Sequence, residues 1–207
     1  MKTIVYVVGD GLYVNMTNRC TNRCDFCIRQ NGSGAYGSDS LWLDEEPTKE
    51  AVMAAIRGAN PTAYREIVFC GYGEPTCRLE DMLWVCREIR AAYPGLPIRL
   101  NTNGQASLLY GKDTTPLFAG CFDTISVSLN EADAAHYDAI CHSRFGEAAF
   151  DGVLRFAQDV KAYVPHVVLS VVDQFLSPEA LQRCREISER IGVPLKVREY
   201  IGKQSAD

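Results

Sequence analysis

The sequence lacks the long apolar segments that a membrane protein needs. No run of about eighteen apolar residues occurs that could cross a bilayer as a helix. The apolar stretch within residues 1–9 is too short for a secretory signal peptide. We therefore expect a cytoplasmic protein with no membrane partner. The sequence also lacks low-complexity tracts, linkers and internal repeats, so residues 1–207 are expected to form a single domain.

An excess of basic residues is also missing. The chain has 21 Lys and Arg against 26 Asp and Glu, a net charge of -5. Strong, sequence-independent binding to a phosphate backbone requires the opposite balance, so the composition argues against it. A hydrophobic content of 47% is nevertheless enough to bury a respectable core in a chain of this length.

Cysteine is the residue type that the sequence does have in quantity, with nine in all. Disulfides are rare in a reducing compartment, where clustered thiols more often indicate metal binding or catalysis. Three of the nine, Cys20, Cys24 and Cys27, are spaced C-x3-C-x2-C, and the other six form no comparable cluster.

No second cysteine pair accompanies this triplet. Structural zinc prefers four ligands, usually from two such pairs, so a zinc site would need a fourth thiol from Cys70 or Cys77. Three thiolates suit a [4Fe-4S] cluster in which one iron has no protein ligand and can bind another molecule. The spacing favours the cluster, and a zinc-stapled interaction domain remains the alternative.

Short apolar runs alternate with segments of helical periodicity, which predicts a parallel sheet with helical crossovers. No hairpin signal is evident. Six parallel strands are too few to close a barrel, so the expected fold is α/β, a partial (βα)6 barrel open on one side. The predicted strands are Leu12–Thr17, Glu66–Cys70, Ile98–Thr102, Thr124–Leu129, Val167–Val172 and Leu195–Tyr200. Helices are expected around residues 52–59, 79–89, 150–157 and 181–191, with starts at Pro47-Thr48 and Ser177-Pro178 and a stop at Gly192.

In such folds the chemistry gathers at the carboxyl ends of the strands. The cysteine triplet follows the first predicted strand and Gly71-Tyr72-Gly73-Glu74-Pro75 follows the second. Asn101 to Gly104 ends the third, and Ser126 to Asn130 ends the fourth. Polar and glycine-rich segments therefore share one rim.

The motif Cys20-x3-Cys24-Asp25-Phe26-Cys27 resembles the signature of the radical SAM superfamily. The resemblance extends over nearly the whole chain, because the core of that family is a partial (βα)6 barrel with the cysteine loop after its first strand. It implies a [4Fe-4S] cluster held by Cys20, Cys24 and Cys27, with S-adenosylmethionine (SAM) chelating the fourth iron.

The same resemblance implies roles for other residues. Phe26 would lie near the adenine, and Gly71, Tyr72, Gly73 and Glu74 would form the segment that holds the methionine amino group. Tyr72 departs from the family pattern of adjacent glycines. Ser128 and Asn130 resemble ribose-contacting positions, and Asn103 belongs to a "TNG" turn seen in some members. By residue chemistry alone, Ser128 and Asn130 could equally face solvent or cap a helix beginning near Glu131.

More narrowly, the run from Tyr6 through the cysteine loop resembles radical SAM proteins associated with TatD-family nucleases. The implied reaction is reductive cleavage of SAM to a 5'-deoxyadenosyl radical that abstracts hydrogen from an unknown substrate, which could be macromolecular. Glycyl-radical activation, nucleotide or nucleic-acid modification, and a non-catalytic Fe-S sensing module are the alternatives. A functional link to a TatD-family nuclease is also implied.

Two further groups of residues are candidates for partners. Arg19, Arg23 and Arg29 surround the triplet and could steer an acidic one-electron donor of the flavodoxin or ferredoxin type, or be ordinary solvated cations. The loop from Cys141 to Gly146, which includes Arg144, is expected over the same rim as a candidate substrate wall.

Overall fold

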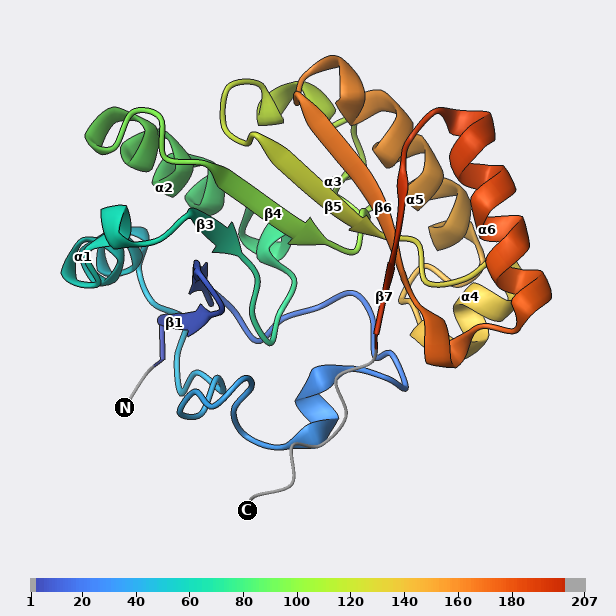
Figure 1. Cartoon of the computed structure of the whole chain (residues 1–207), viewed down its shortest axis with the longest axis horizontal. Coiled ribbons are helices and arrows are strands. Elements are labelled where there is room, and N and C mark those ends of the chain that lie inside the picture. Colours follow the sequence, from blue (N-terminus) through green and yellow to red (C-terminus); the bar gives the residue numbers. More distant parts are fainter. Residues whose placement is uncertain (1–2, 200–207) are drawn as a thin grey trace.

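The computed structural model describes residues 3–199 and shows one sheet in which seven strands follow one another in chain order. Five adjacent pairs, from β2–β3 to β6–β7, are parallel. The expected α/β architecture, an open sheet of the partial-barrel kind, is confirmed (Figure 1). The strands are β1 Val5–Val8, β2 Gly11–Val14, β3 Glu66–Phe69, β4 Ile98–Thr102, β5 Thr124–Ser128, β6 His166–Val172 and β7 Leu195–Arg198.

The first strand is one that the sequence did not lead us to expect. β1 pairs antiparallel with β2 through a two-residue turn, with Val8 opposite Gly11. Gly9 in that turn has a φ of 58°, the left-handed conformation that tight hairpin turns require. The expectation of six strands without a hairpin was therefore wrong at the N-terminal edge. The last predicted strand extended to Tyr200, which lies outside the described residues.

Helices connect the parallel strands. They are α1 Lys49–Gly58, α2 Leu79–Ala92, α3 Ala106–Tyr110, α4 Ala134–Cys141, α5 Ala148–Asp159 and α6 Pro178–Ile191. The expected starts are confirmed, because Thr48 and Ser177 cap α1 and α6 by accepting hydrogen bonds from the N–H groups of Ala51 and Ala180. Gly192 ends α6 with a φ of 64°. Among the described residues, no helix has the length and apolar character needed to span a membrane.

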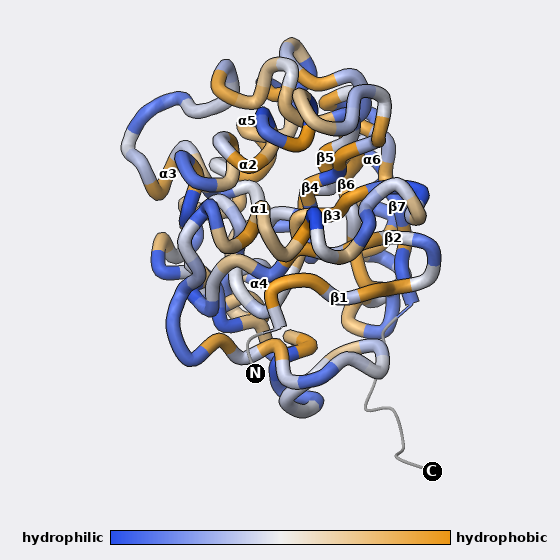
Figure 2. The backbone as a smooth tube through the Cα atoms, turned by 90° about the vertical axis from the view of Figure 1, so that its left-hand side faces the viewer, coloured by the Kyte–Doolittle hydropathy of each residue, from blue (hydrophilic) through white to orange (hydrophobic). Residues whose placement is uncertain are grey.

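The two faces of the sheet differ in character. Leu100, Val127 and Leu169 are fully buried in the main core, together with helix residues such as Met82 and Val153. The strands are mostly hydrophobic, whereas many of the connecting segments are hydrophilic (Figure 2). Residues that alternate with these on the same strands, such as Asn101 and Ser128, line a cavity instead.

Candidate functional site

The cysteine triplet lies in the long segment between β2 and α1, whose only regular element is a short 3₁₀ turn at Ile28–Asn31. The backbone N–H of Asn22 donates to Cys20 Sγ at 3.4 Å, and Arg29 Nε donates to Cys27 Sγ at 3.4 Å. Burial raises the pKa of the Cys20 thiol to about 12. The pKa of Cys24 is also raised, chiefly by its hydrogen bond with Cys141. These thiols therefore favour the protonated form unless a metal displaces the proton.

The spacing of the donor atoms bears on the choice between zinc and a cluster. Within residues 3–199, no three His, Cys, Asp or Glu side chains converge closely enough to hold a single metal ion. A cubane cluster is larger than one ion, and each of its cysteines ligates a different iron, so three separated thiols facing one cavity fit a cluster better than zinc.

A cavity of about 470 Å³ opens beside the cysteine loop and brings all of the predicted site residues together. Its walls come from β2, the cysteine loop, the turn after β3, and the ends of β4, β5, β6 and β7. The predicted residues that line it are Cys20, Cys24, Phe26, Cys27, Gly71, Tyr72, Gly73, Glu74, Asn103, Ser128 and Asn130. Segments from both ends of the chain, from Tyr6 to Glu199, therefore meet at one cavity.

The two glycines after β3 are required by the close approach of the cysteine loop. A Cβ added at Gly71 would lie 2.2 Å from Asn15 Oδ1, and one at Gly73 would lie 2.2 Å from the Thr17 carbonyl oxygen. Any side chain at Gly73 would thus push apart the two loops that border the cavity. Tyr72, between the two glycines, anchors this turn, because its hydroxyl lies 2.9 Å from both the Gly32 and the Gly34 carbonyl oxygens and shares its hydrogen between them.

Glu74 is buried, and its carboxylate accepts hydrogen bonds from three other residues. Oε1 accepts from the N–H and hydroxyl of Thr76 and from the hydroxyl of Thr102 at 2.8 Å, and Oε2 accepts from the Asn103 N–H at 2.7 Å. Burial raises the pKa of Glu74, and these four hydrogen bonds oppose the rise. The carboxylate therefore fixes the turn after β3 to the end of β4.

Asn103 bonds to the cysteine segment directly, whereas Asn130 bonds to Cys141 at the end of α4. Asn103 Nδ2 donates to Thr21 Oγ1 at 2.8 Å, and Asn130 Nδ2 donates to Cys141 Sγ at 3.4 Å. The alternative that Asn130 or Ser128 caps a helix is wrong, because α4 begins at Ala134 and Asp133 is its cap. Asn130 instead has a φ of 63° and turns the chain at the cavity wall.

The loop from Cys141 to Gly146 supports the cysteine segment from outside the cavity. The N–H groups of Arg23 and Asp25 donate to the carbonyls of Cys141 and Ile140, and Arg144 N–H donates to the Thr21 carbonyl at 2.9 Å. No residue of this loop lines the cavity. The expectation of a substrate wall here was therefore wrong, because the cysteine segment lies between the loop and the cavity.

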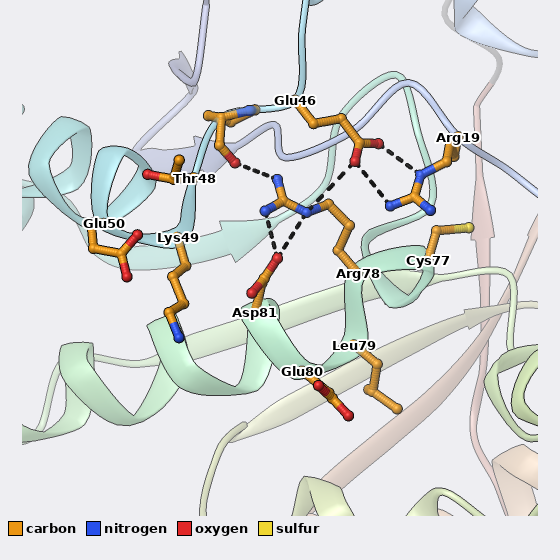
Figure 3. Close-up of a pocket in the computed structure, with 11 residues that line it drawn as sticks. Arg19, Glu46, Thr48, Lys49, Glu50, Cys77, Arg78, Leu79, Glu80 and Asp81 are labelled. Carbon is orange, nitrogen blue, oxygen red and sulfur yellow. Dashed lines mark hydrogen bonds and ion pairs between the residues drawn. The ribbon is translucent and has the colours of Figure 1, made fainter.

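A second, shallower hollow contains Cys77 (Figure 3). Arg78 spans it, with hydrogen bonds to Asp81 Oδ2 at 2.6 Å and to the Met16 and Pro47 carbonyls. Through these hydrogen bonds, Arg78 joins the segment that enters α1 to the start of α2. Cys77 lines this hollow and not the cavity, whereas Cys70 lines the cavity, so these two candidates for a fourth zinc ligand lie in different places.

Several cavity residues were not singled out from the sequence. They are Tyr6, Tyr13, Arg99, Asn101, Lys196 and Arg198. The missed β1–β2 hairpin contributes the two tyrosines, whose rings lie 5.3 Å apart. The others alternate with buried apolar residues along β4 and β7, so their direction follows from strand periodicity once the strands are placed.

Comparison with known proteins gives an independent view of the chain. GTP 3',8-cyclase of Pseudomonas fluorescens is 31% identical over 147 residues, which is 70% of this chain and 40% of that protein. GTP 3',8-cyclase of Paenarthrobacter nicotinovorans is 29% identical over 147 residues, 68% of this chain and 37% of that protein. The chain thus spans about two fifths of the length of these relatives. Because both are cyclases, the narrower prediction of a TatD-associated protein gains no support from them.

Solved structures share the fold at low sequence identity. Streptococcus suis SuiB bound to its precursor peptide SuiA superposes with a TM-score of 0.70 at 17% identity, over 95% of this chain and 40% of SuiB. HydG, a maturase of the [FeFe]-hydrogenase, superposes with a TM-score of 0.63 at 15% identity, over 95% of this chain and 43% of HydG.

A family model decides the assignment. The model described as "Radical SAM superfamily" matches residues 14–195, which include the cysteine triplet and the parallel strands β3 to β6. The cofactors of that family are a [4Fe-4S] cluster and SAM, and the donor set and cavity described above fit both. The chain is an enzyme that belongs to the radical SAM superfamily.

Proposed function

We propose that Cys20, Cys24 and Cys27 ligate the cluster at the mouth of the cavity and that the remaining iron binds SAM within it. The observation that carries this proposal is the convergence of all eleven predicted residues on one cavity wall. When bound, the cluster and SAM supply a 5'-deoxyadenosyl radical through one-electron cleavage of the sulfonium.

The chain's own residues would position SAM. The backbone of the segment from Gly71 to Gly73, which lines the cavity, would bind the methionine end. Phe26 lies 5.0 Å from Phe175 between ring centroids, a pair that would border the adenine. Ser128 and Asn130 would contact the ribose, while Asn103 would hold the cysteine segment through Thr21.

The rest of the cavity would hold the substrate and keep water away from the radical. Tyr6, Tyr13 and Tyr36 form an aromatic wall, and Arg99, Lys196 and Arg198 provide polar contacts beyond Cys70. Catalysis would therefore depend on orientation and sequestration of one C–H bond near the SAM ribose.

A nucleotide is the substrate class that the relatives favour, because the two curated relatives described above are GTP 3',8-cyclases. Glycyl-radical activation and a link to a TatD-family nuclease rest on family resemblance alone. An acidic electron donor of the flavodoxin or ferredoxin type would approach the cysteine loop near the exposed Arg23. Arg19 is less available, since Glu46 pairs with it at 2.8 Å.

Product analysis tests this function. Anaerobically reconstituted protein with SAM and dithionite should yield 5'-deoxyadenosine, and Cys24→Ala should abolish both the cluster and the product. Deuterium transfer into 5'-deoxyadenosine from labelled, fractionated cell extract would then identify the hydrogen donor. Intact SAM in the presence of a well-formed, reduced cluster would instead favour the sensing module.

A further inference from the structure

Three cationic side chains line the cavity, Arg99 on β4 and Lys196 and Arg198 on β7. They differ in whether they form ion pairs with acidic side chains of the protein. Arg99 of β4 is fully engaged: its Nε and Nη2 donate to Glu66 at 3.0 and 2.7 Å, and Nη2 also donates to the Tyr13 hydroxyl. This guanidinium is neutralised by its own carboxylate, so it is poorly placed to bind an anion as well.

Lys196 and Arg198 of β7 lack such partners. Within residues 3–199 neither forms an ion pair with an acidic side chain, and the buried Arg198 Nε has no hydrogen-bond partner. A buried N–H that finds no acceptor in the protein is costly, and native proteins rarely keep one without a reason. Both side chains line the cavity, so an acceptor arriving there could satisfy them.

A third unsatisfied group lies in the same row of the sheet. The strand register pairs Ser128 with Ser170 and Ser170 with Lys196, so the three side chains project from the same face of β5, β6 and β7. Ser170 is fully buried, and its hydroxyl has no partner among the described residues. Ser170 neighbours Lys196 in this row but does not itself line the cavity, so Arg198 Nε is the unpaired donor that an anion in the cavity would meet.

The acidic residues near this row form no ion pair with it in the described part of the chain, although Glu199 also lines the cavity. Asp173 follows β6 and Glu199 follows β7, yet in the described part of the chain neither pairs with Lys196 or Arg198, and one carboxylate oxygen of Asp173 is itself buried without a partner. The charge of Arg198 acts on Cys70 and Tyr36, where it opposes the rise in pKa that burial causes. The guanidinium is therefore near Cys70 and Tyr36, which also line the cavity.

We propose that Lys196 and Arg198 bind an oxyanion of the substrate, a phosphate or a carboxylate, on the β7 wall of the cavity. This deepens the proposed function and rests on it for the identity of the ligand as substrate. A planar guanidinium suits either anion, because its fork of N–H groups matches two oxygens at once.

The anion is a group of the substrate and not the carboxylate of SAM. The glycine segment proposed to hold the methionine end follows β3, and β4, β5 and β6 separate β3 from β7 in the sheet. Because the charge of Arg198 also acts on Cys70, which directly precedes Gly71, the SAM affinity of the β7 variants decides between the two anions.

Calorimetry with simple anions tests this inference. SAM-loaded, reconstituted enzyme is titrated with inorganic tripolyphosphate and with citrate, in low salt. At least one of them should bind, and the one that binds identifies the phosphate or carboxylate source. Arg198→Gln and Lys196→Gln should each weaken that binding at least tenfold. Arg198→Lys should restore part of it, because it keeps the charge but loses the fork.

Arg185→Gln is the matched control, since it removes one exposed cation from α6 outside the cavity and should leave anion binding within twofold. Two further measurements accompany it. Thermal unfolding should show that Arg198→Gln is folded, and its affinity for SAM should stay within twofold. Dithionite-driven 5'-deoxyadenosine formation should be unchanged in Arg185→Gln.

Failure to bind either anion would overturn the inference, as would binding that the two β7 variants do not affect. A tenfold loss of SAM affinity in Arg198→Gln would overturn it too, because the cation would then serve SAM. Absence of 5'-deoxyadenosine in every protein, with anion binding intact, would instead contradict the proposed function and leave the anion site standing.

Discussion

Asn103 donates its backbone N–H to Glu74 Oε2 at 2.7 Å, which joins the end of β4 to the turn after β3. The side chain of the same asparagine donates to Thr21 in the cysteine loop. One buried carboxylate and one asparagine therefore connect the three segments that we propose hold the cluster and SAM.

Replacement of Glu74 by alanine should destabilise the protein by about 3 kcal/mol, because the buried N–H groups of Thr76 and Asn103 would lose their acceptor. SAM binding should weaken in parallel. Urea unfolding of the apo protein measures the first effect and calorimetry the second. Glu186→Ala, at an exposed position on α6, should change the unfolding free energy by about 0.5 kcal/mol or less. Equal stability of the two variants would contradict this account of Glu74.

A methyl group at position 73 should disrupt the site without removing any functional atom. In Gly73→Ala the new Cβ would meet the Thr17 and Arg19 carbonyl oxygens at 2.2 and 2.7 Å, so the cysteine loop must shift. We expect iron incorporation and SAM affinity to fall. Gly58→Ala is the control, because a Cβ there has nothing within 4 Å and alanine favours the helix. Full iron incorporation in Gly73→Ala would show that the loops are not packed as described.

The hydroxyl of Tyr137 should stabilise the cysteine loop through its hydrogen bond with Asn22. It accepts from Asn22 Nδ2 at 3.1 Å and from Gln105 Nε2 at 2.9 Å in a fully buried setting. Tyr137→Phe should cost about 1–3 kcal/mol, because both donors lose this acceptor. Thermal unfolding of Tyr137→Phe is the measurement, and Tyr163→Phe, at an exposed tyrosine, is its control. An unchanged melting temperature for Tyr137→Phe would refute the role.

The cap of α4 should make part of the stability depend on acidic pH. The His136 N–H, and then its imidazole, lower the pKa of Asp133 below its ordinary 3.8. A lowered folded-state pKa adds stability above pH 3.8, and this contribution is lost as the pH falls through the folded value. Asp133→Ala should cost about 1 kcal/mol near neutral pH and much less at about pH 2.

Asp133→Asn is the matched control for this effect. Asparagine still offers a side-chain oxygen to the His136 N–H, so most of the cap energy should remain at neutral pH. The acid-dependent part should disappear, since the amide does not titrate. An Asp133→Ala variant that loses the same stability at neutral and at strongly acidic pH would count against the ionised cap.

The sequence predicted much of this site because its signals are local. The spacing of Cys20, Cys24 and Cys27, the glycines after β3 and the caps at Thr48 and Ser177 each depend on a few neighbouring residues. Strand periodicity placed five parallel pairs correctly, with boundaries that differ by at most three residues where the structure describes them. That residues 1–207 form a single domain stays a prediction, as the chain spans about two fifths of its relatives.

What the sequence did not predict depends on long-range packing. The β1–β2 hairpin escaped notice because its turn, Gly9-Asp10, follows an apolar run that reads equally as a single N-terminal segment. The loop after α4 was expected in the cavity, but its backbone hydrogen bonds to the cysteine segment could not be read from residue types. That Arg198 Nε finds no partner within residues 3–199 likewise emerges only when the neighbouring strands are in place.

The most direct test of the central claim is low-temperature electron paramagnetic resonance of the anaerobically reconstituted, dithionite-reduced protein, recorded before and after addition of SAM. Three thiolates leave one iron free, so a reduced [4Fe-4S] signal should appear and SAM should change its g values. Cys20→Ala, Cys24→Ala and Cys27→Ala should each lose the signal, whereas Cys184→Ala should keep it. A cluster signal that SAM does not alter, or protein that incorporates zinc and no iron, would contradict the account.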